Sequence, residues 1–169
     1  SKIVTYLEDL FDVEIDSMDG DDIYIGKSMT DQINFIIPYT LVITACGAVS
    51  YIGAFMRPGT AMITVDYWHL KNNKSSHIDS YIWEYLPDRK TYYYYVRINE
   101  WEMPHDFQIP HRDRVEGLAL DDVRNEADYR IKAPRLSKYV YSALLWIEHY
   151  NGWTDTFKRP DMFPIHDID

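Results

Sequence analysis

The chain has few of the residues that fix a fold through cross-links. Its 169 residues include a single cysteine, so an internal disulfide is impossible, and the six histidines show no metal-ligand spacing. A membrane-spanning helix needs about 20 consecutive apolar residues, and every apolar run in this chain is shorter. We therefore expect no structural zinc and no membrane segment, and we expect one domain held together by a hydrophobic core.

Positive charge is also scarce. Lys and Arg together number 17 against 27 Asp and Glu, which gives a net charge of −10. A nucleic-acid-binding protein gathers cations on one face to displace counterions, so this balance argues against nucleic acid as a partner. Hydrophobic residues make up 46% of the chain and no polar low-complexity tract interrupts it, so we expect a folded chain.

The spacing of apolar residues outlines the flanking elements. The predicted helices span residues 2–11, 30–39 and 134–150, the second with Ser28 or Thr30 as its N-cap. The predicted strands outside the central unit span residues 12–15, 23–26, 78–86 and 91–98. We divide the chain into an α/β core, residues 1–113, and a helical extension, residues 114–169, that packs on the same domain.

The most informative segment is residues 41–66, LVITACGAVSYIGAFMRPGTAMITVD. It predicts an apolar strand, a turn of small residues, a helix that begins at Val49 or Ser50, and a second strand over 61–65. The helix is expected to end at Pro58 and Gly59. This order of elements is typical of half of a nucleotide-binding fold.

The turn after the first strand is the predicted ligand site. The first N–H groups of a helix lack partners within it and lie at the positive end of its dipole, which favours a phosphate. Asp66 follows the second strand at its carboxyl end, where open α/β sheets place ligand groups. The turn has neither the three spaced glycines of a dinucleotide fingerprint nor the Lys-Ser or Lys-Thr pair of an NTPase loop. A strand-helix-strand unit that binds nothing is the alternative.

Residues 30–66 resemble the carboxyl-terminal signature of glycosyltransferase family 61. There an acidic-Gln-Ile triplet on a helix precedes an apolar strand, a His-Gly-Ala or Cys-Gly-Gly turn, a helix ending in Phe-Met or Phe-Leu, a Pro-Gly pair and an aliphatic strand. The same order stands here as Asp31-Gln32-Ile33, Leu41 to Ala45, Cys46-Gly47-Ala48, Phe55-Met56-Arg57-Pro58-Gly59 and Ala61 to Val65. The chain departs from the family pattern at two positions. Cys46 stands where many members have His, and Thr64 stands where many have an acidic residue. Asp66 lies two positions further along the strand and therefore on the same face as Thr64.

The resemblance implies an α/β fold, a Rossmann-like three-layer domain similar to the carboxyl-terminal, donor-binding half of a GT-B glycosyltransferase. It implies transfer of a sugar from a nucleotide-sugar, with a UDP-sugar favoured, to a hydroxyl of a glycan or glycoprotein. The nucleotide-sugar is a substrate, and no cofactor is expected. The predicted donor-binding residues are Gln32, Cys46, Gly47, Ala48, Val49, Ser50, Thr64 and Asp66.

No metal ligand and no catalytic base are assigned. Asp19-Gly20-Asp21 has the Asp-x-Asp form of a metal-binding triplet, but an Asp-Gly turn explains it more simply, so metal-independent transfer is expected. In the family much of the acceptor site comes from an amino-terminal lobe. The chain is then a fragment, a half that needs a partner chain, or a relative without catalysis.

Two further questions stay open at this point. The alternative function is a noncatalytic interaction domain that binds a protein or glycan through its tyrosine-rich segment. The compartment is undetermined: the Golgi or endoplasmic reticulum lumen fits a eukaryotic family member, and the cytoplasm fits a bacterial or viral one.

Overall fold

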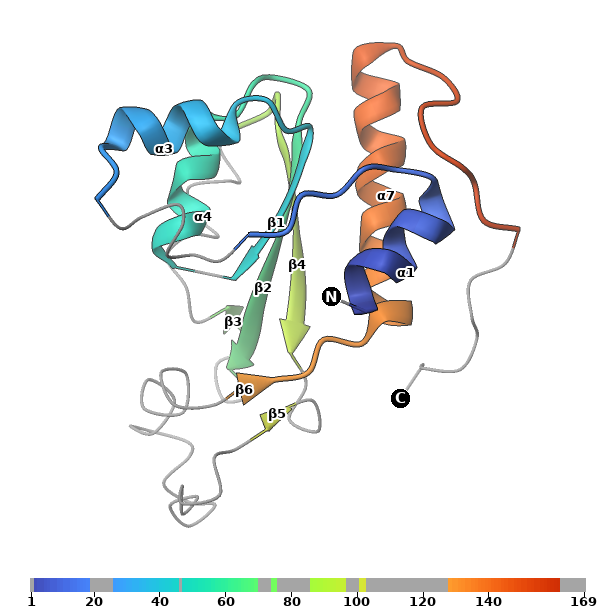
Figure 1. Cartoon of the computed structure of the whole chain (residues 1–169), viewed down its shortest axis with the longest axis horizontal. Coiled ribbons are helices and arrows are strands. Elements are labelled where there is room, and N and C mark those ends of the chain that lie inside the picture. Colours follow the sequence, from blue (N-terminus) through green and yellow to red (C-terminus); the bar gives the residue numbers. More distant parts are fainter. Residues whose placement is uncertain are drawn as a thin grey trace.

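The computed structural model describes residues 2–18, 26–45, 47–69, 74–75, 86–96, 101–102 and 128–161. Over these ranges the chain has a mixed α/β fold built on a small parallel sheet, which confirms the predicted α/β class (Figure 1). None of the described helices has both the length and the apolar composition needed to cross a bilayer.

Three parallel strands form the sheet, with the longest in the middle. They are β1 (Leu41–Ala45), β2 (Ala61–His69) and β4 (Lys90–Val96), and β2 pairs with both of the others. Two antiparallel pairings involve shorter strands: β3 (Lys74–Ser75) with the end of β2, and β5 (Trp101–Glu102) with β6 (Asp128–Tyr129). Parallel neighbours need a crossover connection, and between β1 and β2 this is α4 (Ala48–Ile52) with the 3₁₀ turn η1 (Gly53–Phe55).

The two faces of the sheet are covered by different helices. On one side lie α1 (Lys2–Phe11) and α7 (Ala133–Asn151), and on the other lie α3 (Met29–Ile36) and α4 (Figure 1). Side chains alternate between faces along a strand, so Ile63 packs toward α1 and α7 while Met62 packs toward α3 and α4. The sequence therefore folds into helix, sheet and helix layers.

The larger hydrophobic core lies between the sheet and the α1 and α7 layer. Its buried members are Leu7, Phe11, Ala61, Ile63, Val65, Tyr94, Val96, Leu136, Val140, Ala143, Ile147 and Phe157. The smaller core, between the sheet and the α3 and α4 layer, has Ile36, Ile52, Met56 and Met62 as its buried members. Tyr92 also belongs to the α7 side, where its hydroxyl donates to the carbonyl of Ser142 at 3.0 Å.

Helix α7 is the longest described element, and both of its ends are fixed by local chemistry. A proline stands in its first turn, where a missing N–H has no cost, and Gly152 closes the helix with φ 67°. At the carboxyl end the side chain of Asn151 donates to the carbonyl of Gly59 at 2.9 Å and so ties α7 to the residues just before β2. The helix predicted over 134–150 is confirmed to within one residue at each end.

The segment after α7 returns to α1. Phe157 is buried against the ring of Phe11, and the N–H of Lys158 donates to the carbonyl of Phe11 at 2.7 Å. The buried carboxylate of Glu148 accepts from the N–H and the hydroxyl of Thr156 at 2.7 and 2.9 Å. Its other oxygen accepts from Arg159 at 2.8 Å, so this one α7 side chain binds the returning segment at two residues.

Several predicted boundaries differ from the structure. The prediction of a strand over 12–15 was wrong. Asp12 takes φ 52°, and the N–H of Ile15 donates to the carboxylate of Glu8 at 3.3 Å rather than to a neighbouring strand. Helix α3 begins after the N-cap Ser28 and ends at Ile36, short of the predicted 39.

The other boundary differences concern the central unit and the later strands. Helix α4 begins at Ala48, one residue before the predicted start, and gives way to η1 well before Pro58. Strand β4 covers most of the strand predicted over 91–98. The strands predicted over 23–26 and 78–86 lie outside the described residues, apart from Gly26 and Leu86, which are not in strands.

Candidate functional site

The candidate site is the turn between β1 and α4, at the carboxyl edge of the parallel sheet. Gly47 precedes the first residue of α4 and has φ 123° and ψ −149°. This region of backbone space is open almost only to glycine, because a Cβ would collide with the neighbouring peptide. The geometry therefore accounts for a glycine at position 47.

The turn is closed by a serine from the helix itself. The hydroxyl of Ser50, which is fully buried, donates to the carbonyl of Gly47 at 2.7 Å and accepts from the Gly47 N–H at 3.3 Å. The Ser50 N–H donates to the same carbonyl at 3.0 Å. Two of the amides predicted to hold a diphosphate, those of Gly47 and Ser50, are thus used inside the turn.

The face of the sheet below α4 changes from apolar to polar toward its carboxyl end. One register row across the strands consists of Val42, Met62 and Thr91, and Val42 and Met62 belong to the smaller core. The next row on the same face consists of Thr44, Thr64 and Tyr93, and we call it the hydroxyl row. Every side chain of this row carries a hydroxyl.

Thr64, in the middle of the hydroxyl row, is buried without a hydrogen bond. Its side chain is 1% exposed, and its Oγ1 has no partner among the described residues. A buried hydroxyl in this state costs about 1–3 kcal/mol of stability. Beside it, the rings of Tyr93 and Tyr95 stack with their centroids 5.9 Å apart and an angle of 15° between their planes.

The remaining predicted site residues are not all brought to this edge. Gln32 is half-buried in α3, and its side-chain amide donates to the carbonyl of Lys27 at 3.3 Å; among the described residues no hydrogen bond joins it to Gly47 or Thr64. Asp66 pairs with Tyr95 through the backbone of β2, but its side chain lies outside the described residues. Cys46 lies outside them as well.

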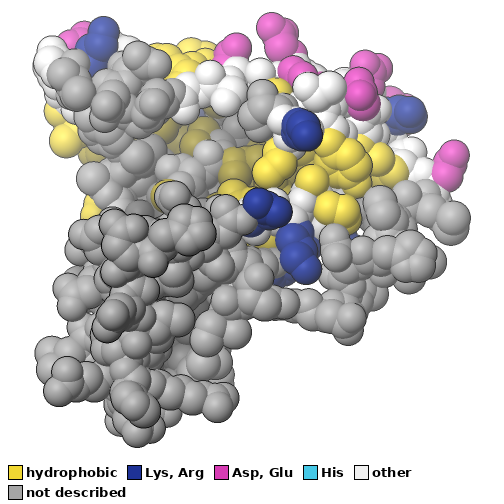
Figure 2. Space-filling view, turned by 60° about the horizontal axis from the view of Figure 1, so that its bottom comes forward, with side chains coloured by type: hydrophobic (Ala, Val, Ile, Leu, Met, Phe, Trp, Pro, Cys, Tyr) yellow, Lys and Arg dark blue, Asp and Glu magenta, His cyan; other side chains and the backbone are white. Residues whose placement is uncertain are grey.

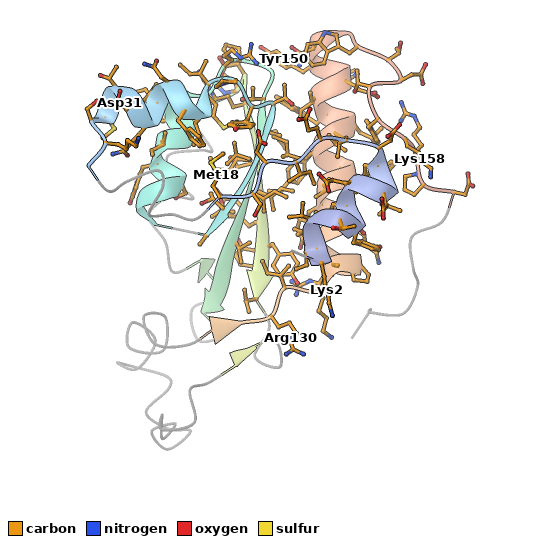
Figure 3. The ribbon with its side chains drawn as sticks, viewed as in Figure 1. Lys2, Met18, Asp31, Arg130, Tyr150 and Lys158 are labelled. Atoms are coloured by element: carbon orange, nitrogen blue, oxygen red, sulfur yellow. The ribbon has the colours of Figure 1, made fainter. Side chains whose placement is uncertain are left out.

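The start of α3 is occupied by its own cap. The hydroxyl of Ser28 donates to the carboxylate of Asp31 at 2.7 Å, and the Asp31 N–H donates back to Ser28 at 3.2 Å. Hydrogen bonds from the Ser28 side chain and backbone lower the pKa of Asp31. Figure 3 shows Asp31 at the outer end of α3, away from the sheet. The acidic residue of the acidic-Gln-Ile triplet therefore serves the helix cap.

Comparisons with protein-family models, with curated proteins and with solved structures gave no match.

Basic residues gather at the same end of the sheet as the candidate turn. Arg135, in the first turn of α7, donates to the carbonyl of Tyr95 and lies over the ring of Tyr94 with 4.2 Å between its guanidinium carbon and the ring centre. The N–H of Lys132 donates to the hydroxyl of Tyr94 at 3.1 Å. Arg130 precedes them in sequence, and Figure 3 shows it at the end where the strands finish. Figure 2 shows Lys and Arg side chains beside an apolar surface, with acidic side chains along the upper rim.

This basic group was missed in the sequence, although the signal was present. Three cations fall within six residues at the start of a long helix that has no acidic residue in its first turn. Cations at the N-terminus of a helix lie at the positive end of its dipole, which is unfavourable. Their presence there therefore indicates a role other than stabilising the helix. Among the residues that the structure describes, no three His, Cys, Asp or Glu side chains lie close enough to share a metal ion.

Proposed function

We propose that this chain is the donor-binding domain of a glycosyltransferase related to family 61, with a Rossmann-like architecture of the GT-B type. Its substrate would be a nucleotide-sugar, with a UDP-sugar favoured, and the sugar would pass to a hydroxyl of a glycan or glycoprotein. The observation that carries the proposal is the glycine-only turn at Gly47, set between the carboxyl end of β1 and the first turn of α4. Open α/β sheets bind their ligands at this edge.

In the proposed complex the diphosphate lies against the amides of Ala48 and Val49. Helix α4 has only five residues, so its dipole is weak and direct hydrogen bonds from these amides would do most of the binding. They would also stabilise the charge that develops on the leaving nucleotide, which is the role a metal ion has in other glycosyltransferases. The basic group at the start of α7 would add an attractive field in a chain of net charge −10.

The alternative of an interaction domain with a tyrosine-rich surface has less support. Tyr94 is fully buried in the larger core, and the hydroxyl of Tyr92 is bonded to α7. Half of the four-tyrosine run therefore serves the packing of the domain. Tyr93 and Tyr95 lie on the α4 face, where their rings stack on each other.

The proposal is tested by calorimetric titration of the chain with UDP, a UDP-sugar and a GDP-sugar, with and without EDTA. We expect UDP and the UDP-sugar to bind, and EDTA to have no effect. Gly47→Ala should weaken UDP binding by about tenfold or more, because the Cβ forces the turn into another conformation at a cost of about 1–3 kcal/mol.

The matched control is Gly152→Ala. It also places a Cβ at a positive φ, 67°, but in open space and at the far end of α7. It should lower stability and leave UDP affinity unchanged. If the wild-type chain binds no nucleotide at all, the donor-domain proposal is wrong and the interaction domain takes its place.

A further inference from the structure

The hydroxyl row places polar side chains on a sheet face that is covered by a helix layer, where apolar side chains are usual. One row earlier, the same face carries Val42 and Met62, which pack into the smaller core. Valine has nearly the shape of threonine, so a valine at position 64 would fill the same space without leaving a buried hydroxyl unbonded. The fold gains nothing from the hydroxyl of Thr64, and this points to a role in binding.

The chemistry of the row limits what it can bind. A hydroxyl can both donate and accept, and the row carries no charge. Thr44 already donates to the carbonyl of Ala45 at 3.1 Å, so it faces a ligand as an acceptor. Such a set suits uncharged groups that have both donors and acceptors, such as ribose hydroxyls or the edge of a pyrimidine. It is poorly suited to a diphosphate, which needs several strong donors.

The position of the row agrees with this chemistry. Thr44 lies three residues before Gly47, and at about 3.3 Å per residue this puts the row roughly 10 Å or less from the turn. That distance is about the reach of a nucleoside from its own diphosphate. Thr44 and Tyr93, both half-buried, flank the buried Thr64, so the ends of the row are more accessible than its centre.

We infer that the hydroxyl row of Thr44, Thr64 and Tyr93 is the nucleoside subsite of the donor, with the hydroxyl of Thr64 as its central hydrogen-bonding group. The inference rests on the proposed function, since it assumes that the diphosphate binds at the Gly47 turn. Because Thr64 is 1% exposed, α4 must shift off the sheet slightly for the nucleoside to reach it.

The test compares two identical changes on the same face of the same stretch of chain. Thr64→Val removes the unbonded hydroxyl. Thr60→Val removes a hydroxyl that is just as buried, at 2% exposed, but that donates to the carbonyl of Arg57 at 2.6 Å. Thr60 is the residue just before β2 begins. Each variant is measured for its urea midpoint and for its affinity for UDP and for inorganic pyrophosphate.

We expect Thr64→Val to have a urea midpoint equal to or above that of the wild type, and to bind UDP about tenfold more weakly while binding pyrophosphate unchanged. Thr60→Val should unfold at lower urea and keep its affinity for UDP. The two variants would then separate the stabilising hydroxyl from the ligand-binding one.

Three results would overturn the inference while leaving the proposed function intact: unchanged UDP affinity in Thr64→Val, an equal loss of affinity for UDP and pyrophosphate, or a lowered urea midpoint for Thr64→Val. The first would remove Thr64 from the subsite, the second would assign the effect to the diphosphate turn, and the third would reveal a structural role. If wild-type chain binds neither UDP nor pyrophosphate, the proposed function and the inference both fail.

Discussion

The carboxylate of Glu148 offers the sharpest test of how the chain is stabilised. Glu148→Gln keeps the shape of the side chain and one oxygen that can accept from Thr156, but it turns an amide toward Arg159. A hydrogen bond to a charged group contributes about 1.5–3 kcal/mol to stability. The side chain of Arg159 is 45% exposed, so solvent screens its interaction with Glu148 and the contribution of this bond lies at the lower end of that range. We expect a loss of about 2 kcal/mol, or a fall in Tm of about 4–8 °C for a chain of this length.

The loss should depend on pH in a defined direction. Burial alone would raise the pKa of Glu148, but the hydrogen bonds from Thr156 and the charge of Arg159 outweigh it and hold the pKa below its ordinary value of 4.5. A carboxylate with a lowered pKa in the folded state stabilises the fold above pH 4.5, and this contribution fades as the pH falls through the lowered pKa. Glutamine does not titrate, so the gap between wild type and variant should narrow below pH 4.5.

Urea unfolding at pH 7 and at steps below pH 4.5 measures the gap directly. Glu14→Gln is the control, because Glu14 is exposed and the same loss of charge there should change stability by less than about 0.5 kcal/mol. A gap that stays constant with pH, or a variant as stable as the wild type at pH 7, would refute the reasoning.

Two further changes probe the anchors of α7. Gly59→Ala should destabilise the chain by about 1–3 kcal/mol in urea unfolding, because Gly59 has φ +79° and its Cβ would lie 2.5 Å from Oδ1 of Asn151; a stability within 0.5 kcal/mol of wild type would contradict this. Arg135→Met should cost about 2 kcal/mol through loss of the bond to the Tyr95 carbonyl and the stack on Tyr94. Arg135→Lys should recover a measurable part of this loss but less than half of it, because lysine keeps the charge and lacks the planar fork. Equal stability of the Met and Lys variants would assign the cost to packing alone.

Local patterns predicted the elements that depend on local chemistry. The spacing of apolar residues gave α1 and α7 almost to the residue, and the small-residue turn after β1 appeared where the sequence placed it. The strand over 12–15 failed because a brief apolar alternation does not show that a neighbouring strand exists. Here the carboxylate of Glu8, in α1 and seven residues earlier, accepts from the N–H of Ile15 instead.

Features that join distant parts of the chain could not be predicted in the same way. The hydroxyl row exists only because the register sets Thr44 beside Thr64 and Thr64 beside Tyr93, and nothing local to any strand specifies that alignment. The closing role of Ser50 is different, since a serine three residues after the turn glycine is a capping pattern that was readable. The same amides also suit a phosphate, so the sequence alone does not decide between a cap and a ligand site.

The unequal size of the two hydrophobic cores has a consequence for motion. Among the described residues, the layer of α1 and α7 is fastened to the sheet by the larger core and by the Asn151 and Glu148 anchors, while α3 and α4 rest on a much smaller cluster. Fluctuations that open a protein locally start where the least apolar contact must be given up. Amide protons of α4 should therefore exchange with solvent sooner than those of α7, and this is the behaviour that the inferred nucleoside subsite requires of α4.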